Sequence, residues 1–292
     1  MAIVNGTNGD DKINSAFGTT DNDDQVFGKK GDDKIQAGLG ADQLNGGKGN
    51  DTADYRDSGE GVEIGLGGGT PGIGGTAEGD TLKKIENLYG SQHADTLYGN
   101  GGDNKIKGFG GDDGLKGGGG SDKLLGGSGN DILFGEDVLA ESGDDDIIKG
   151  GSGNDIAFGQ FGDDLIKGGK GNDQISGGLG DDTLYGNKGL DQFVFDSKLD
   201  KFNNVDLVMD FKSGVDKFVL YADIFTAIGP TLEASEFRLG KNAADADDYL
   251  IYHQKKGKLF YDADGNGAGD KVLFAKLDNK ESLNFTDFEI VT

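Results

Sequence analysis

The chain has 292 residues, of which 57 are glycine, and only 34% are apolar. Soluble domains usually contain about 7% glycine and about 45–50% apolar residues, so burial of apolar surface gives this chain a weak driving force for folding. Its formal net charge is −25, which argues against nucleic acid and anionic membrane surfaces as direct partners. The same charge calls for a bound cation, because carboxylates at this density repel one another in a compact state.

Several kinds of segment and site are absent from the sequence. There is no cysteine, which excludes disulfides and thiolate metal sites. No stretch approaches the ~18 apolar residues of a transmembrane segment. The N-terminal MAIVNGTNGDDKI has neither a basic region nor a long apolar run, so we expect no cleavable secretory signal there.

Nonapeptide repeats dominate the first two thirds of the chain, with the frame G-G-x-G-x-D-x-U-x, where U is a large apolar residue. Five units follow Gly150 without a break: GGSGNDIAF, GQFGDDLIK, GGKGNDQIS, GGLGDDTLY and GNKGLDQFV. Five more start at Gly90, and a first block of five starts at Gly6. The glycines permit a tight turn with positive φ, and the eighth residue is expected to face inward from a short strand. These inward residues include Ile35, Leu44, Leu97, Ile106, Leu115, Leu133, Ile166, Ile175 and Leu184.

Because each unit supplies one turn and one strand, two units form a coil of 18 residues, and units 18 residues apart stack at ~4.8 Å. Stacked sixth-position carboxylates would repel each other, so a cation must lie between them. Oxygen-only ligands with flexible geometry favour calcium over magnesium and the transition metals. The pairs in strict register are Asp24/Asp42, Asp33/Asp51, Asp95/Asp113, Asn104/Asp122, Asp113/Asp131, Asp155/Asp173, Asp164/Asp182 and Asp173/Asp191. Looped-out insertions would add Asp11/Asp33, Asp122/Asp145, Asp131/Asp155 and Asp145/Asp164, giving roughly 8–12 calcium ions.

These units resemble the repeats-in-toxin (RTX) family of haemolysin-type calcium-binding repeats. The resemblance implies an all-β fold, a calcium-bound parallel β-roll, in which each ion takes two carbonyls and one aspartate from each of two stacked turns. One site would use Gly151, Gly153 and Asp155 with Gly168, Lys170 and Asp173, and the next Gly169, Gly171 and Asp173 with Gly186, Lys188 and Asp191. The expected ligands are Asp11, Asp24, Asp33, Asp42, Asp51, Asp95, Asn104, Asp113, Asp122, Asp131, Asp145, Asp155, Asp164, Asp173, Asp182 and Asp191, with carbonyls of Gly31, Gly46, Gly111, Gly126, Gly151, Gly153, Gly162, Gly168, Gly169, Gly171, Gly177 and Gly186.

Some units depart from the frame. Asn104 replaces an aspartate, so we expect its site to be weaker. His93 stands in place of the fourth-position glycine and is either a pH-sensitive contributor or part of an edge turn that supplies only a carbonyl. The unit TTDNDDQVF lacks its glycines. Residues 135–149 form a repeat with six extra, looped-out residues, which puts Asp145 or Asp146 in the ligand position.

The composition divides the chain into an RTX roll over residues 1–192, interrupted at 55–89 and 135–149, and a β-rich cap over 193–292. Within 55–89, VEIGL and TLKKIENLYG predict strands. The stretch resembles an insertion common inside RTX arrays, and this resemblance implies that the chain keeps coiling without turn aspartates. The loop GLGGGTPGIGG lacks the Lys-Ser/Thr of a phosphate-binding loop. Beyond residue 192 aromatic residues become frequent, as expected of a cap with its own core. The runs DQFVFD, VDLVMDF, DKFVLY, EFRLG, YLIYH, KLFYD and KVLFAKL predict strands, and ADIFTAI predicts one short helix.

The C-terminal region resembles that of serralysin-type proteases and other type I secreted proteins, in NVDLVMDFKSGVDKFVL, KLFYDADGNGAGDKV and the closing DFEIV. The resemblance implies an uncleaved secretion signal, the type I secretion machinery as a partner, and an extracellular or cell-surface location. Asp262, Asp264 and Asn266 resemble the opening of an EF-hand loop, but Leu273 occupies the twelfth position, so we interpret the segment as a polar hairpin turn.

The sequence gives no motif for catalysis. His93 and His253 are isolated, so there is no HExxH, and neither a cysteine nucleophile nor G-x-S-x-G is present; an acid pair stays open. We therefore expect a secreted, non-catalytic calcium-binding protein, similar to small secreted rhizobial calcium-binding proteins. Two alternatives remain. One is the C-terminal repeat module of a larger secreted enzyme, such as a protease, lipase or alginate epimerase. The other is a surface-layer protein or one that binds cell-surface polysaccharide.

Overall fold

The repeats fold as alternating turns and short strands in a computed structural model that describes residues 2–14, 18–36, 38–68, 70–136 and 143–292. Two compact units are formed, Met1–Ser152 and Gly153–Thr292. Helical structure in the described ranges consists of short 3-10 turns at Gly75–Ala77, Gln254–Lys256 and Phe285–Asp287, so the predicted all-β class is confirmed. No helix among these residues has the length and apolar character needed to cross a membrane.

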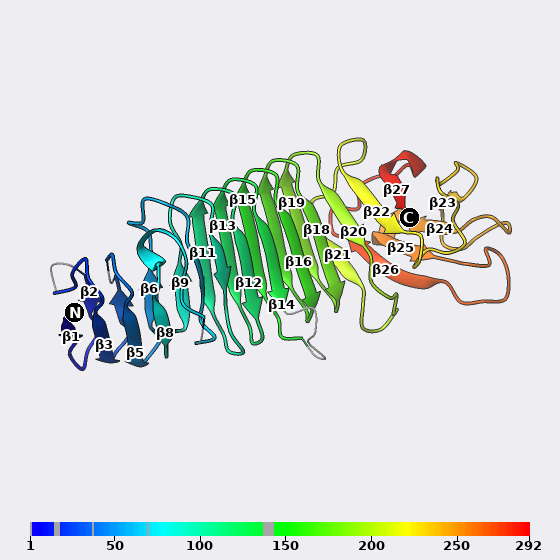
Figure 1. Ribbon diagram of the computed structural model, residues 1–292. Coiled ribbons are helices and arrows are strands. Elements are labelled where there is room, and N and C mark those ends of the chain that lie inside the picture. The colour runs from blue at the N-terminus through cyan, green and yellow to red at the C-terminus, as the bar shows by residue number, and fades with distance from the viewer. Residues whose placement is uncertain (1, 15–17, 37, 69, 137–142) are drawn as a thin grey trace. The chain divides into compact units, whose positions relative to one another are not determined.

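Unit 1 consists of parallel strands that lie side by side in three groups (Figure 1). The first is β1 (Ile3–Asn5), β3 (Gln25–Lys30), β5 (Gln43–Lys48) and β8 (Thr81–Lys83). The second is β2 (Lys12–Ile13), β4 (Lys34–Ile35), β6 (Thr52–Asp54), β9 (Asn87–Tyr89), β11 (Lys105–Gly110), β13 (Lys123–Ser128) and β15 (Ile147–Ser152). The third is β7 (Glu63–Gly65), β10 (Thr96–Tyr98), β12 (Gly114–Gly118) and β14 (Ile132–Glu136).

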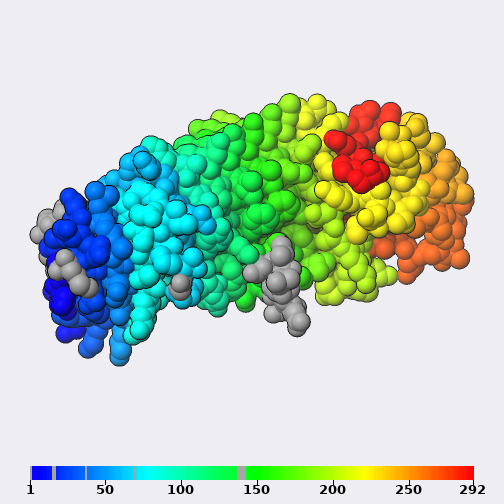
Figure 2. All heavy atoms as spheres, in the orientation of Figure 1, coloured from blue at the N-terminus to red at the C-terminus, as the bar shows by residue number. Residues whose placement is uncertain are grey.

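The 18-residue register predicted from the repeats is confirmed within each unit. In unit 1, Ile106 pairs with Leu124 one coil later, and in unit 2, Ile166 pairs with Leu184. In Figure 2 the colour of unit 1 changes gradually from blue to green. This is expected of a stack in which each coil follows the previous one in sequence. The predicted inward residues are all buried, and these form the apolar core between the strands.

The interruption at 55–89 keeps the chain coiling, as predicted. Strand β8 pairs with β5 through Gln43 and Thr81, and β9 pairs with both β6 and β11. The expectation that this segment lacks turn carboxylates is wrong, because Asp80 and Glu86 each accept a hydrogen bond from the stacked turn, as the site geometry below shows.

Unit 2 continues the parallel pattern and then changes direction. One group is β16 (Ile156–Phe161), β18 (Gln174–Leu179), β20 (Gln192–Phe195), β22 (Lys217–Tyr221) and β27 (Phe288–Val291), all parallel. The other group begins with four parallel strands, β17 (Leu165–Lys170), β19 (Thr183–Lys188), β21 (Asp206–Val208) and β26 (Val272–Leu277). It continues with β25 (Lys258–Tyr261), β24 (Leu250–His253) and β23 (Phe237–Leu239). Strand β25 is antiparallel to both β26 and β24, and β23 is parallel to β24.

The seven strands predicted after residue 190 are confirmed as β20 to β26. The short helix predicted at ADIFTAI is wrong, since residues 222–228 form turns. Phe225 and Ile228 are buried there, but Gly229 and Pro230 follow directly and stop a helix from propagating. The division predicted at 192 and 193 remains a prediction about where the repeat frame ends.

An aromatic cluster forms the core of the C-terminal part of unit 2. The ring of Phe218 stacks on Phe211 with centroids 4.3 Å apart and on Phe288 at 5.4 Å. Phe193, from the last repeat, contacts both Phe211 and Phe218. Because aromatic side chains bury a large apolar area, this cluster supplies cohesion that the glycine-rich coils lack.

Candidate metal sites in the repeat turns

Each regular turn contains two residues in the left-handed region of backbone space. In the turn before Asp173, Gly169 has φ 130° and Gly171 has φ 121°, conformations that side-chain-bearing residues rarely adopt. The turn therefore favours glycine at its second and fourth positions, although Lys29, Phe109, Gln160 and Asn187 adopt positive φ at the second. The predicted glycines in these two positions all have positive φ: Gly31, Gly111, Gly151, Gly153, Gly162, Gly169 and Gly171.

The first-position glycines serve a different purpose, which is to leave room for the turn carboxylate. A Cβ atom added at Gly168 would collide with Oδ2 of Asp173, and one at Gly186 would collide with Oδ2 of Asp191. The same collision would occur at the other predicted first-position glycines, Gly46, Gly126 and Gly177. The turn is thus built around the position of its aspartate.

The sixth-position side chains stack as the register predicts. The backbone amide of Asp155 donates to Oδ1 of Asp173 at 2.9 Å, and the amide of Asp173 donates to Oδ1 of Asp191 at 3.1 Å. The same hydrogen bond, between 2.6 and 3.1 Å long, joins all eight pairs predicted in strict register. Asp11 and Asp33 are joined in the same way at 2.9 Å. The predicted Asp131/Asp155 and Asp145/Asp164 pairs each combine a residue of unit 1 with one of unit 2, and they stay predictions.

The second carboxylate oxygen is buried, and in many turns it accepts no hydrogen bond from the part of the chain that the structure describes. An unsatisfied anionic oxygen in the interior is strongly unfavourable unless a cation pairs with it. The Oδ2 atoms in this state belong to Asp33, Asp42, Asp51, Asp113, Asp122, Asp173 and Asp182, whose residues are at most 2% exposed.

Backbone carbonyl oxygens converge on these carboxylates. A Cβ atom at Gly28 would meet both Oδ2 of Asp33 and the carbonyl of Gly46, which comes from the next coil. Between the turns that carry Asp173 and Asp191, the carbonyl oxygen of Lys188 accepts a hydrogen bond from the backbone amide of Gly171 at 2.8 Å. Its second lone pair remains available to a cation. Carboxylate and carbonyl oxygens together form the ligand set that calcium prefers.

Side chains alone do not form a metal cluster in this arrangement. No group of three His, Cys, Asp or Glu side chains gathers in a metal-binding arrangement within the described ranges. Each stacked pair offers two carboxylates, so the remaining ligands have to be backbone carbonyls. This accounts for the requirement for glycine, since carbonyls can approach an ion closely only where side chains are missing.

Burial shifts the acidity of the stacked carboxyls. Burial raises the pKa of Asp113 and Asp122 to about 8 and that of Asp173 to about 7. Amide hydrogen bonds oppose the shift, while neighbouring carboxylates add to it. The calcium-free turns therefore disfavour the charged state that a calcium ion would stabilise.

The structure corrects one predicted ligand position. Asp146, not Asp145, accepts the amide of Asp122 on Oδ1, at 2.7 Å. Asp146 is buried and Asp145 is exposed. The reason lies in the strand that follows: Ile148 is the buried eighth-position residue, which makes the aspartate two residues earlier the turn residue. The six extra residues, 137–142, lie outside the described residues.

Four of the described turns that lack a second-position glycine are closed differently. The amide of Thr20 donates to Oδ2 of Asp24 at 2.7 Å, so this carboxylate is already satisfied locally. The turn containing His93 has the same arrangement, and the His93 side chain is exposed while its carbonyl accepts the Ser91 hydroxyl. This fits the interpretation of an edge turn. The same local closure joins Thr7 to Asp11, Ser91 to Asp95 and Asn100 to Asn104.

Four stacked carboxylates were missed by the sequence reasoning. Asp80, Glu86, Asp206 and Asp216 accept the amides of Asp42, Asp51, Asp182 and Asp191 at 2.8, 2.8, 3.4 and 3.1 Å. Each stands two residues before a buried apolar residue, and this D-x-U or E-x-U triplet could have revealed them without the glycines. At Asp80 the hydroxyl of Tyr55 donates to the second oxygen at 3.1 Å, so a protein donor stands where a cation would otherwise be needed.

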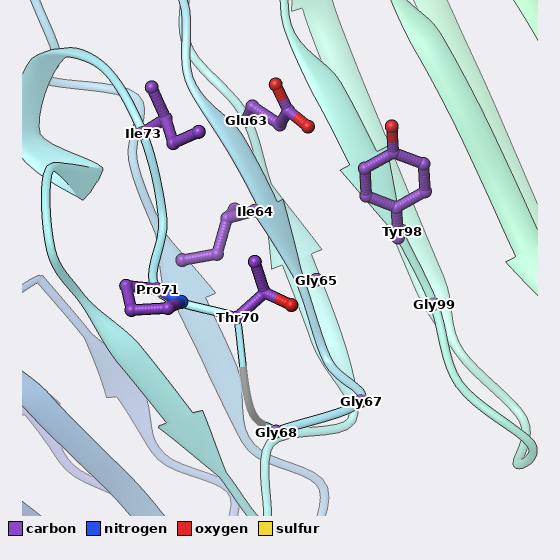
Figure 3. A pocket seen from close by; sticks show the side chains of 10 residues that line it. All are labelled: Glu63, Ile64, Gly65, Gly67, Gly68, Thr70, Pro71, Ile73, Tyr98 and Gly99. Atoms are coloured by element: carbon purple, nitrogen blue, oxygen red, sulfur yellow. The ribbon is translucent and has the colours of Figure 1, made fainter.

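A cavity of about 470 Å³ lies beside β7 and β10 in unit 1. Figure 3 shows Tyr98 and Glu63 on its strand side, with Thr70, Pro71 and Ile73 on the loop opposite. Among the described residues that line it, Glu63 is the one carboxylate, so the paired acids of a glycosidase do not meet in this cavity.

The match to a family model agrees with this geometry. Residues 18–53, 89–124, 115–137, 142–174 and 158–193 match the family model of the RTX calcium-binding nonapeptide repeat (4 copies). No curated protein matches the chain. Two solved structures are similar to it. The extracellular lipase LipA from Serratia marcescens is 17% identical over 98% of this chain, with a TM-score of 0.27. The AlgE6R3 subunit of the Azotobacter vinelandii mannuronan C5-epimerase is 22% identical over 56%, with a TM-score of 0.19.

The parallel coils and their stacked aspartate turns define the class as a calcium-binding β-roll. The matched segments of this chain are RTX calcium-binding nonapeptide repeats, as the resemblance of their sequence implied. The chain spans 39% of the length of the lipase and covers 80% of the epimerase subunit, and neither likeness says what this chain binds or acts on.

Proposed function

We propose that this is a secreted, non-catalytic protein that folds when calcium binds and acts outside the cell or at its surface. The observation that carries the proposal is the row of buried aspartate Oδ2 atoms without hydrogen-bond donors in the described residues. Burying so many carboxylates is unfavourable without a cation, and the surrounding oxygens suit calcium.

The best-described site in unit 2 lies between the turns that carry Asp173 and Asp191. These two carboxylates, with the carbonyls of Gly169, Gly171, Gly186 and Lys188, would hold one ion. When bound, calcium supplies positive charge that offsets the carboxylates and links one coil to the next. The chain itself contributes the rest: the glycines shape the turn, and the amide of Asp173 orients the Asp191 carboxylate through its hydrogen bond.

Calcium binding and folding are expected to be a single event, because the coil has little else to hold it together. Only 34% of residues are apolar, and the net charge is −25. Metal binding free energy then becomes folding free energy. Far-ultraviolet circular dichroism should show a disordered chain in excess chelator and a β-rich one on addition of calcium. A β-rich spectrum in chelator at neutral pH would overturn the proposal.

The unfolded calcium-free state fits export by a type I system. Sites with the affinity of extracellular calcium modules, ~10⁻⁴–10⁻³ M, stay empty at cytosolic calcium and fill outside the cell. The support for a C-terminal signal is the sequence resemblance in residues 190–292. A chain ending at Val194 should therefore remain in the cells that make it, whereas the full chain reaches the medium. Equal secretion of the two chains would refute the signal and leave the calcium sites untouched.

A further inference from the structure

A basic cavity lies on the first strand group of unit 1, over β3 and β5. It has a volume of about 370 Å³, within the range of ~300–1,000 Å³ common for ligand sites, and four lysines line it: Lys29, Lys30, Lys48 and Lys84. None of the four forms an ion pair with any described residue. Four unpaired cations gathered in one cavity are unexpected in a chain with a net charge of −25.

The backbone at two of these lysines is strained. Lys29 has φ 86° and Lys84 has φ 52°, a conformation that residues with a side chain rarely adopt. Gly47 pairs with Lys29 in the next coil and stands at the same turn position, where its φ is 115°. Glycine would thus be the more stable residue at position 29. Phe109, Gln160 and Asn187 have positive φ at the same turn position in other repeats, so the strain at Lys29 belongs to the repeat turn, and a glycine there would avoid it.

The other two lysines repel each other. Lys30 and Lys48 are direct partners in the parallel pairing of β3 and β5, at a strand spacing of ~4.8 Å. Like charges placed directly opposite each other destabilise a sheet. An anion in the cavity would offset the repulsion between the stacked charges, and the lysines at the strained positions add further ammonium groups to it.

The remaining lining identifies the kind of anion. Phe27 is half-buried and offers part of its ring to the cavity, and its cross-strand partner Asn45 and the exposed Asn8 offer amides. An aromatic face packs against the C–H face of a sugar ring, amides bond hydroxyl groups, and ammonium groups pair with carboxylates. We propose that this cavity binds an acidic saccharide whose sugar rings carry carboxylates.

Binding should depend on calcium, a step that rests on the function proposed above. Asp33 and Asp51 lie three residues after Lys30 and Lys48, so their charges weaken the positive field of the cavity when the turns hold no calcium. Calcium in these turns would neutralise them. The calcium-loaded protein is therefore the form that takes the saccharide.

Titration calorimetry with the full chain in saturating calcium tests the site, with a tetramer of galacturonate as the probe. Its methyl ester is the matched control, because it keeps the sugar rings and loses the charges. We expect the acid to bind at least about tenfold more tightly than the ester, and salt to weaken its binding. Equal binding of acid and ester, or binding of sulfate alone as tightly as the tetramer, would overturn the proposal.

Lys29→Gly separates binding from folding. It should raise the melting temperature in calcium, because the strain is relieved, and lower the affinity for the tetramer about fivefold or more. Lys30→Gln with Lys84→Gln should also lower the affinity. Lys105→Gln with Lys123→Gln, a stacked lysine pair elsewhere in unit 1, should leave it unchanged. Unchanged affinity for the tetramer in Lys29→Gly would refute this cavity as the binding site. A wild-type chain whose fold does not change on addition of calcium would instead refute the proposed function.

Discussion

Asp155 donates its backbone amide to Oδ1 of Asp173 over 2.9 Å, and Asp173 repeats the same contact to Asp191. The carboxylate of Asp173 is thereby held by the coil before it. The backbone amide of Asp173 in turn holds the carboxylate of the coil after it. The buried Oδ2 of Asp173 accepts no hydrogen bond from the described residues. In the proposed ligand register, each interior aspartate of a block would therefore belong to two successive ion sites, which would couple the sites along the stack.

Asp173→Ala should be among the most damaging single substitutions. It removes a carboxylate from two sites, and hydrogen bonds to charged groups contribute about 1.5–3 kcal/mol, so the calcium midpoint of folding should rise on the order of tenfold. Calcium titrations followed by circular dichroism measure this midpoint. Asp223→Ala, at an exposed turn of the same unit, is the matched control and should leave it unchanged. Equal midpoints for the two variants would show that the assigned ligand register is wrong.

Acid should partly replace calcium. Burial raises the pKa of Asp113 and Asp122 from 3.8 to about 8 and that of Asp173 to about 7. Because the folded pKa lies above the unfolded one, the folded state binds more protons. The stabilisation of the folded state by these bound protons is complete below the unfolded pKa and is lost as the pH rises through the folded pKa values. Calcium-free protein should be disordered at neutral pH and gain β-structure in circular dichroism as the pH falls from 7 towards 4, and a spectrum that stays disordered throughout would contradict this.

Asn104→Asp should strengthen a weak site. The backbone amide of Asn104 donates to Oδ1 of Asp122 at 2.7 Å, as the backbone amides of the aspartates do in their own pairs. The Asn104 side chain, however, brings no charge to the pair. A second carboxylate should lower the calcium midpoint roughly threefold, since ligand charge raises calcium affinity. Asn203→Asp, at an exposed position, controls for the added charge. A midpoint that does not move would mean that the local closure by the Asn100 amide, rather than the missing charge, limits this site.

The regular part of the fold could be predicted because the repeat has a strict period. Once two units make a coil of 18 residues, the inward position of Ile106 and the stacking of Asp173 on Asp191 follow from counting alone, and the structure shows both. The positions of the glycines also carried information, since glycine is the residue that best suits the positive φ of the second and fourth turn positions and the close approach at the first.

Counting failed where the spacing between stacked turns changed. Asp42 and Asp80 are 38 residues apart, and Asp51 and Glu86 are 35 apart, so no fixed period connects them. The length of a looped-out segment does not decide which of two adjacent aspartates enters the turn, which is why Asp145 was chosen over Asp146. In both cases the buried apolar residue two positions later decides, because the strand must present it to the core.

The stack should also depend on its narrow apolar core. Ile106 is fully buried on β11 and pairs with Leu88 and Leu124 in the coils on either side. Ile106→Ala removes apolar contact with both coils and leaves a cavity, so it should lower the free energy of unfolding in calcium by about 2–5 kcal/mol. Chemical denaturation at fixed calcium concentration measures this difference.

Ile132→Ala is the matched control for Ile106→Ala, because it makes the same change in the same unit at a side chain that is 43% exposed on β14. It should change the free energy of unfolding by less than about 0.5 kcal/mol, as surface substitutions usually do. Because calcium binds only the folded chain, raising its concentration stabilises both variants by mass action and leaves the difference between them. A difference that vanishes at high calcium would show that the ions, and not the apolar core, hold neighbouring coils together.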